Sequence, residues 1–184
     1  MACRARYVGG DTNKVAAKPN PSYPIEKGDL VFQHTDGMIR PVATLNEQGS
    51  AALDQLGAAK NFLGVADEKY APQSGETLFH INALKPASIS VCTTGRFEFA
   101  CPSQTFTAQQ SVGVYSDGTG IPDSQKVDSL QGAAALAQSI GIVALSEGYI
   151  AGGAAVTRVI VDIMGRRPLA TAPVAGDYTG TSGM

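Results

Sequence analysis

The feature that most constrains the fold is the alternation of polar and apolar side chains between Ser88 and Gly118. Arg96-Phe97-Glu98-Phe99 alternates charges with aromatic rings, the period of a strand with one wet face and one buried face. Apolar alternating runs flank it at 88–93 and 111–115, and Cys101-Pro102-Ser103 is expected to break the middle strand. We therefore expect three successive strands, with Arg96 and Glu98 solvated and with Glu98→Gln having little effect.

The rest of the chain also favours short strands. The 184 residues correspond to one domain, and 21 Gly and 10 Pro indicate many turns. Further strands are expected at 30–33, 38–42, 62–66, 77–81, 139–145 and 156–164. A helix is expected at about 49–62, with Ser50 as its N-cap. The sequence predicts an all-β fold, a small β-barrel or a β-sandwich, with one short helix around residues 50–60 and extended N- and C-terminal arms.

Three of the expected strands share the pattern apolar-Gly-apolar-apolar, centred on Gly64, Gly113 and Gly141. A glycine inside a strand marks a bulge, a bend or the close approach of another backbone. The side chains predicted to form the core come from these strands and their neighbours: Phe62, Leu63, Val91, Phe97, Phe99, Val112, Val114, Ile140, Ile142 and Ile160.

The two ends differ in composition from the middle. Residues 1–24 carry four basic side chains and one acidic one, a net charge of +3, whereas residues 25–165 carry eight and fourteen, a net charge of −6. We expect an extended N-terminal arm at 1–24, a β-rich core domain at 25–165 and a loosely held or partner-bound C-terminal tail at 166–184. The arm either hangs free or is held by a partner. A basic arm on an acidic body does not favour nucleic acid as the partner.

Sequence motifs for chemistry are sparse. Cys92, Cys101 and His80 lack the spacing of a metal site, and neither of these cysteines has a neighbouring cation that would activate it as a nucleophile. Cys92 and Cys101 either face each other across a hairpin or are small buried residues, and the second reading is favoured. The chain has three cysteines, an odd number, and they are widely spaced, which indicates a reducing compartment. Neither a secretory signal nor a membrane span is expected. We expect no enzyme activity, no catalytic residues, no metal and no cofactor.

Six short motifs occur in a characteristic order: Lys27-Gly28-Asp29-Leu30-Val31, Phe62-Leu63-Gly64-Val65-Ala66, Thr93-Thr94-Gly95-Arg96-Phe97-Glu98-Phe99, Ser111-Val112-Gly113-Val114, Ile140-Gly141-Ile142-Val143 and Val159-Ile160-Val161-Asp162-Ile163. In this order the chain resembles the capsid decoration (cement) proteins of tailed bacteriophages, small β-rich structural proteins, over roughly residues 25–165.

The resemblance implies a non-enzymatic virion protein that binds the outer surface of the mature head and stabilises contacts between major capsid protein subunits. It also implies a homotrimer at local threefold axes, assembled in the bacterial host cytoplasm. From the composition of the two ends, the expected contacts with the capsid are Arg4, Arg6, Tyr7, Lys14, Lys18, Tyr23, Arg166 and Arg167. The alternatives are a receptor- or glycan-binding virion module, which would use tyrosines such as Tyr115 or Tyr149, and another head–tail or tail component.

Overall fold

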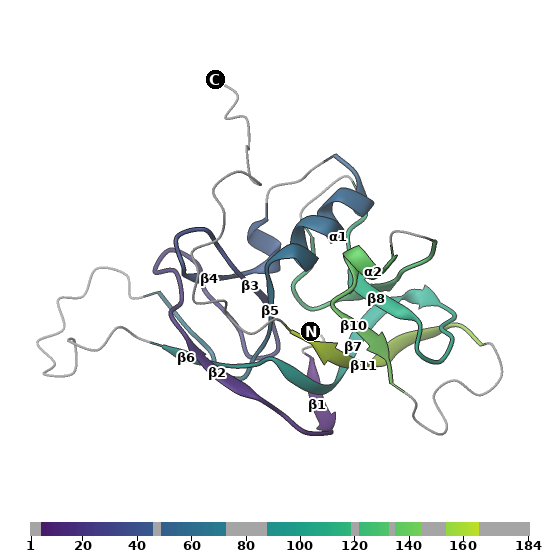
Figure 1. The fold of residues 1–184 in the computed structure, drawn as a ribbon, viewed down its shortest axis with the longest axis horizontal. Coiled ribbons are helices and arrows are strands. Elements are labelled where there is room, and N and C mark those ends of the chain that lie inside the picture. The colour runs from purple at the N-terminus through teal and green to yellow at the C-terminus, as the bar shows by residue number, and fades with distance from the viewer. Residues whose placement is uncertain are drawn as a thin grey trace, which may run out of the picture.

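The fold consists of two antiparallel β-sheets with two short α-helices (Figure 1). The structure is a computed structural model that describes residues 5–45, 49–72, 88–118, 122–132, 135–144 and 154–165. Within these residues, the predicted all-β class with a short helix after residue 50 is confirmed. The strand expected at 77–81 lies outside the described residues.

Each sheet combines strands from distant parts of the chain. In spatial order, sheet A contains β1 (Arg6–Gly9), β7 (Thr94–Gln104), β11 (Val156–Met164), β10 (Gly141–Val143), β8 (Ser111–Val114) and β9 (Val127–Ser129). Sheet B contains β2 (Lys14–Ala17), β6 (Ile89–Cys92), β5 (Phe62–Ala66), β3 (Leu30–Gln33) and β4 (Ile39–Pro41). The helical segments are the 3-10 turn η1 (Val42–Thr44), α1 (Ala51–Lys60) and α2 (Ala135–Gln138).

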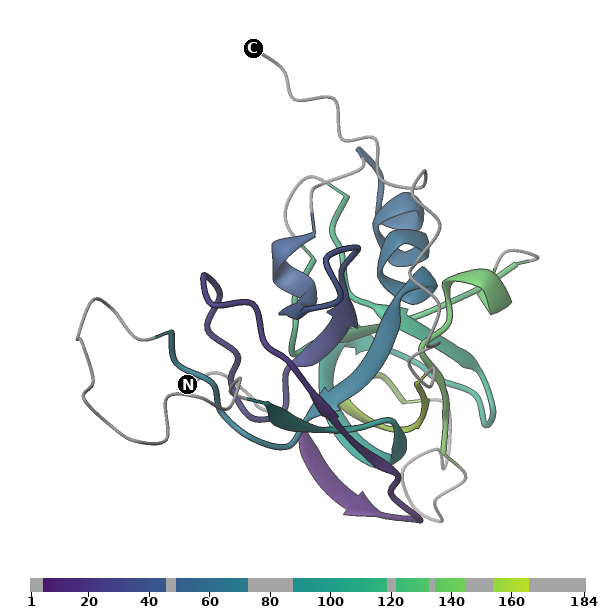
Figure 2. The ribbon, with the colours of Figure 1, turned by 60° about the vertical axis from the view of Figure 1, so that its left-hand side comes forward.

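Sheet A is curled, so that β9 at its far edge lies beside β7. Ala100 of β7 forms an isolated parallel bridge with Lys126, just before β9, and the Ser129 hydroxyl donates to Oε1 of Gln104 at 2.7 Å. Sheet B packs against this curled sheet through one shared core, in which Phe32 and Phe62 join Phe99. The molecule thus combines a nearly closed barrel with a second packed sheet. Figure 2 shows α1 and η1 at the end of the molecule opposite β1.

The middle strand of the 88–118 stretch is longer than expected. The predicted break at Cys101-Pro102-Ser103 is wrong, because β7 continues through these residues to Gln104. The pairing of β7 with β11 shifts register between Val156 and Arg158, opposite this segment. A register shift leaves backbone groups outside the regular ladder, so a proline without an N–H is tolerated there.

Two of the three glycines in the apolar-Gly-apolar-apolar pattern are needed for close backbone approach. A Cβ on Gly64 would lie 2.1 Å from the carbonyl oxygen of Cys92, and one on Gly141 would lie 2.3 Å from that of Asp162. A Cβ on Gly113 would instead meet the Leu130 side chain at 3.0 Å. The interpretation of the apolar-Gly-apolar-apolar pattern as a packing signal is therefore confirmed at Gly64 and Gly141.

The helix α1 is capped as predicted but buries an unexpected face. Ser50 accepts from the backbone N–H of Leu53. Leu53 itself is half exposed, whereas Asp54 and Gln55 are buried. The Ser116 hydroxyl donates to Oδ2 of Asp54 at 2.6 Å, and a satisfied hydrogen bond of this kind allows a carboxylate to lie inside.

Most of the predicted core is buried, namely Phe62, Leu63, Val91, Phe97, Phe99, Val112, Val114 and Ile140. Ile142 and Ile160 are only half buried, so their placement in the core is wrong. Side chains alternate along a strand, and the inward positions of β10 and β11 are held by Val143 and by Val159, Val161 and Ile163.

The N-terminal segment does not follow the expected boundary at Ile25. Instead of extending from the body, it supplies β1 at the edge of sheet A and β2 at the edge of sheet B. Backbone pairing with β7 and β6 compensates for the low apolar content that made this segment look unstructured. Residues 166–184 lie outside the described residues.

Candidate functional site

The candidate site is built around residues 5–17, which we call the N-terminal ribbon. The ribbon runs antiparallel to the β6–β7 segment and crosses with it from one sheet to the other. At the crossing, the Thr93 N–H donates to the carbonyl oxygen of Asn13 at 2.8 Å, and the Asn13 N–H donates to Oγ1 of Thr94 at 2.9 Å. These bonds hold the ribbon on both sheets at once.

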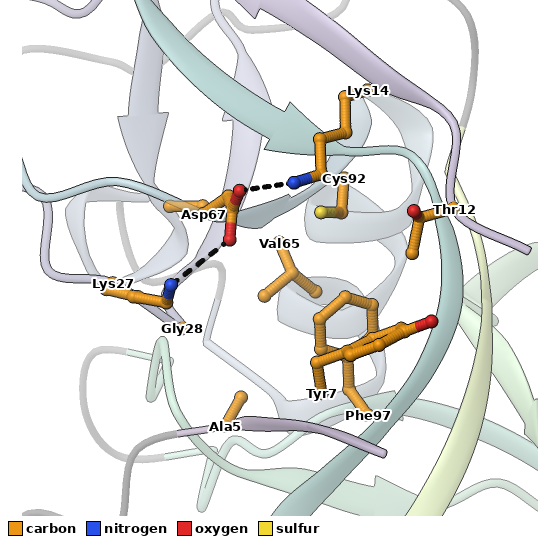
Figure 3. A pocket seen from close by; sticks show the side chains of 11 residues that line it. Ala5, Tyr7, Thr12, Lys14, Lys27, Gly28, Val65, Asp67, Cys92 and Phe97 are labelled. Atoms are coloured by element: carbon orange, nitrogen blue, oxygen red, sulfur yellow. Dashed lines mark hydrogen bonds and ion pairs between the residues drawn. The ribbon is translucent and has the colours of Figure 1, made fainter. Parts of the chain in front are cut away.

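A small pocket of about 220 Å³, which we call the ribbon pocket, lies between the ribbon, the turn at Lys27 and Gly28, and strands β5 and β6. Figure 3 shows Lys14, Asp67 and Lys27 on one side of it, Tyr7 and Phe97 on the other, and Val65 between them. Its remaining lining residues are Ala5, Thr12, Gly28, Ala66 and Cys92. The pocket therefore joins an apolar floor to a charged rim.

The rim is a three-membered ion cluster. Nζ of Lys14 lies 2.6 Å from Oδ2 of Asp67, and Nζ of Lys27 lies 3.2 Å from Oδ1. The hydrogen bond from Lys14 is the largest effect on Asp67 and, with Lys27, holds the pKa of this carboxyl below its usual value. The same hydrogen bond raises the pKa of Lys14. Two lysines and one aspartate give the cluster a formal net charge of +1.

The floor is aromatic and aliphatic. The rings of Tyr7 and Phe97 meet edge to face with centroids 5.6 Å apart, and Val65 is buried beside them. The Tyr7 hydroxyl donates to the carbonyl oxygen of Gly10 at 2.6 Å, which fixes the ring while leaving it half exposed. Burial raises the pKa of the Cys92 thiol, so this group is a neutral part of the lining.

Three of the predicted contact residues, Arg6, Tyr7 and Lys14, are brought together on the ribbon, and all three are exposed. Lys18 is also exposed but lies beyond the end of β2. Tyr23 lies away from the ribbon pocket, in a separate shallow groove that includes Pro41 and Asp123. Arg4, Arg166 and Arg167 lie outside the described residues.

Glu98 is not solvated, so the expectation of an exposed charge beside Arg96 is wrong. Its side chain is buried between Arg6, whose Nη2 lies 3.2 Å from Oε2, and Arg158, whose Nε lies 3.1 Å from Oε1. Arg96 instead pairs with Asp162 at 3.1 Å. The guanidinium groups of two neighbouring strands cover the carboxylate, which the sequence of β7 alone does not reveal.

The other partners of this site were also not identified from sequence. Lys27 and Asp67 reach Lys14 from a turn and from the end of β5, and nothing in the sequence of those segments links them to the ribbon. The sequence of β2, Lys14-Val15-Ala16-Ala17, gives only a weak strand signal, because Val15 is its one large apolar residue.

Cys92 and Cys101 are free and buried, in agreement with the favoured reading of these cysteines. Burial raises the pKa of the Cys101 thiol to about 11. Among the described residues, no group of three or more His, Cys, Asp or Glu side chains is placed to hold a metal ion. Within the same part of the chain, no helix has the length and hydropathy to cross a membrane.

In comparisons with known proteins, no family model matches the chain, and no curated protein and no solved structure is significantly similar to it.

Proposed function

We propose that this chain is a non-enzymatic capsid decoration protein of a tailed bacteriophage. In this role it binds the outer surface of the mature head, as a homotrimer at local threefold axes, and stabilises contacts between major capsid protein subunits. The protein is then part of the virion and assembles in the cytoplasm of the bacterial host.

One observation carries the proposal: the six motifs of the resemblance fall on the strands that build the core. Phe62–Ala66 is β5 and Ser111–Val114 is β8, and the remaining motifs contribute to β3, β7, β10 and β11. These motifs form the framework of the fold, and because a framework alone does not determine function, the proposed role rests on the family resemblance. Motifs scattered over loops would not support the family assignment.

The charge distribution supports a contact through the ribbon. Residues 1–24 have a net charge of +3 on a body of net charge −6, and Arg6 and Lys14 are exposed there. Arginine and tyrosine are frequent in protein interfaces, and Arg6 and Tyr7 lie next to each other on β1. Because the ribbon is paired into both sheets, it presents these groups with little loss of conformational entropy on binding.

The test is addition of the purified protein to expanded heads that lack it. Binding is measured by co-sedimentation, and head stability by the temperature at which a dye first reaches the packaged DNA. We expect saturable binding and a higher rupture temperature. Failure to bind, or binding without any change in rupture temperature, contradicts the proposal.

A matched pair of variants tests the contribution of the ribbon. Lys14→Ala combined with Lys18→Ala removes two charges from the N-terminal segment, and we expect weaker binding to heads. Lys60→Ala combined with Lys69→Ala removes two exposed charges from the body and serves as the control. Equal effects of the two double variants would show that the contact is not made through the ribbon.

The alternative, a receptor- or glycan-binding module, depends on exposed tyrosine rings. Tyr115 is only partly exposed, and Nζ of Lys126 lies over its ring at 5.6 Å from the centroid. Tyr149 lies outside the described residues. No feature of the described surface favours this function over capsid binding.

A further inference from the structure

From the chemistry of the ribbon pocket, we infer that it binds the C-terminal residue of a partner protein chain. The free carboxylate of that residue pairs with Lys14 and Lys27, and its apolar side chain lies on Val65, Phe97 and the ring of Tyr7. This pocket shares Tyr7 and Lys14 with the proposed capsid contact, but the inference rests on the pocket itself and not on the proposed function.

The charged rim fits a single negative charge. An ammonium group has three N–H donors, and Lys14 and Lys27 each contact one oxygen of Asp67, so donors remain on both. Two positive groups and one carboxylate leave one positive charge, which one further carboxylate balances. Two other acidic groups flank the cluster in sequence, and neither lines the pocket. Oε1 of Glu26 lies 2.8 Å from Nζ of Lys69. Glu68, whose charge also acts on Lys14, accepts from the Ser90 N–H through Oε2 at 3.2 Å.

The floor fits an apolar side chain. Val65 and Phe97 are 1% and 5% exposed, and the Tyr7 hydroxyl is turned to Gly10, so that carbon atoms face the hollow. Figure 3 shows Tyr7 and Phe97 opposite the Lys14–Asp67–Lys27 cluster, with Val65 between them. A ligand that satisfies both sides must carry its carboxylate and its apolar group on neighbouring atoms.

The size of the pocket restricts this ligand to about one residue. Its volume of about 220 Å³ holds about seven water molecules at roughly 30 Å³ each, and it is smaller than the roughly 300–1,000 Å³ of sites for drug-sized molecules. A residue inside a chain would need space for backbone on both sides. A C-terminal residue needs it on one side only, and Thr12, which lines the pocket, carries a hydroxyl that can pair with the preceding peptide group.

The test uses the N-acetylated peptide Gly-Gly-Leu with a free carboxylate, its C-terminal amide, and 4-methylpentanoate as a free acid without a peptide chain. Binding to the full chain is followed by methyl NMR, with Val65 and Ala66 as reporters. We expect the peptide acid to shift these methyl signals, and the amide and the free acid to bind at least tenfold more weakly. No binding of the peptide acid, equal binding of the amide, or equal binding of 4-methylpentanoate would each overturn the inference.

Variants locate the binding. Lys14→Met and Lys27→Met should each weaken binding of the peptide acid at least threefold, whereas Lys18→Met, at an exposed lysine outside the pocket, should not. Ala5→Leu fills the hollow from the half-buried N-terminal side and should abolish binding. Thermal unfolding by circular dichroism identifies variants that remain folded. Folded Ala5→Leu protein that binds normally, or a Lys18→Met effect as large as that of Lys14→Met, would contradict the assignment.

Discussion

The backbone N–H of Thr93 donates to the carbonyl oxygen of Asn13 at 2.8 Å, where two antiparallel segments pass from one sheet to the other. This bond joins residues 80 positions apart in the chain. It makes the N-terminal ribbon part of the fold, and it places Lys14 and Tyr7 over the ribbon pocket.

Deletion of residues 1–17 should therefore destabilise the whole protein. The deletion removes β1 and β2, exposes the edges of β6 and β7, and takes away the Tyr7 ring that contacts Phe97. A loss of about 1 kcal/mol lowers the melting temperature by roughly 2–4 °C in a domain of this size, and we expect a decrease of at least about 10 °C. Lys14→Ala is the control and should change it little. An unchanged melting temperature would show that the ribbon is an appendage.

Phe97→Ala should cost about 3–5 kcal/mol in the free energy of unfolding, because a buried phenylalanine leaves a large cavity. Phe97 lies between Tyr7 and Phe99, with ring centroids at 5.6 and 6.3 Å. This loss is a large part of the roughly 5–15 kcal/mol that stabilises a typical domain. Urea unfolding measures it, with Tyr7→Phe as the mild comparison. A cost below about 1 kcal/mol would mean that the 88–118 stretch is not central to the core.

Glu98→Gln should destabilise the protein by about 1.5–3 kcal/mol, the range for hydrogen bonds to charged groups. The substitution removes the charge that Arg6 and Arg158 share and leaves their guanidinium groups without a carboxylate partner at this position. Asp162→Asn is the matched control, since its pair with Arg96 is more exposed and such pairs contribute about 0–1 kcal/mol. Chemical denaturation gives the free energy of unfolding of both variants. Equal losses in the two variants would contradict the burial of Glu98.

Protonation of Asp67 at low pH should weaken the attachment of β2, because Asp67 pairs with Lys14 of this strand. The pKa of this carboxyl is lower in the folded protein than its ordinary value of 3.8, so its contribution to stability is present above that value and is lost as the pH falls below it. Hydrogen exchange of the β2 amides gives the opening free energy, which should fall as the pH decreases from about 4. In the Asp67→Asn variant, the opening free energy of the β2 amides should already be low at pH 6 and should depend less on pH. The Asp123→Asn variant should show the same pH dependence as the original protein.

Much of the fold could be predicted because the relevant signals are local. The strands at Leu30–Gln33 and Phe62–Ala66 are apolar runs bounded by turns, Val156–Met164 is rich in β-branched residues, and Ser50 marks the start of α1. The packing role of Gly64 and Gly141 followed from their place within strands.

What could not be predicted depends on contacts between distant segments. Residues 5–17 have too few apolar side chains to be recognised as strands, and they become ordered by pairing with β6 and β7. Glu98 has the local pattern of a solvated residue, but arginines from β1 and β11 bury it. Ile160 belongs to the face of β11 that also carries Arg158 and Asp162, but the local run Val159-Ile160-Val161 is apolar on both faces and does not by itself fix which face is buried. The Lys14–Asp67–Lys27 cluster exists only once three separate segments have met.

The proposal that this chain decorates a phage head is tested by a cryo-EM map of phage particles that contain it. We expect density for the two-sheet body on the outer surface of the head, in three copies around local threefold axes, with the ribbon facing the major capsid protein. Density for this fold in the tail or at the head–tail junction, or its absence from the head surface, would contradict the assignment.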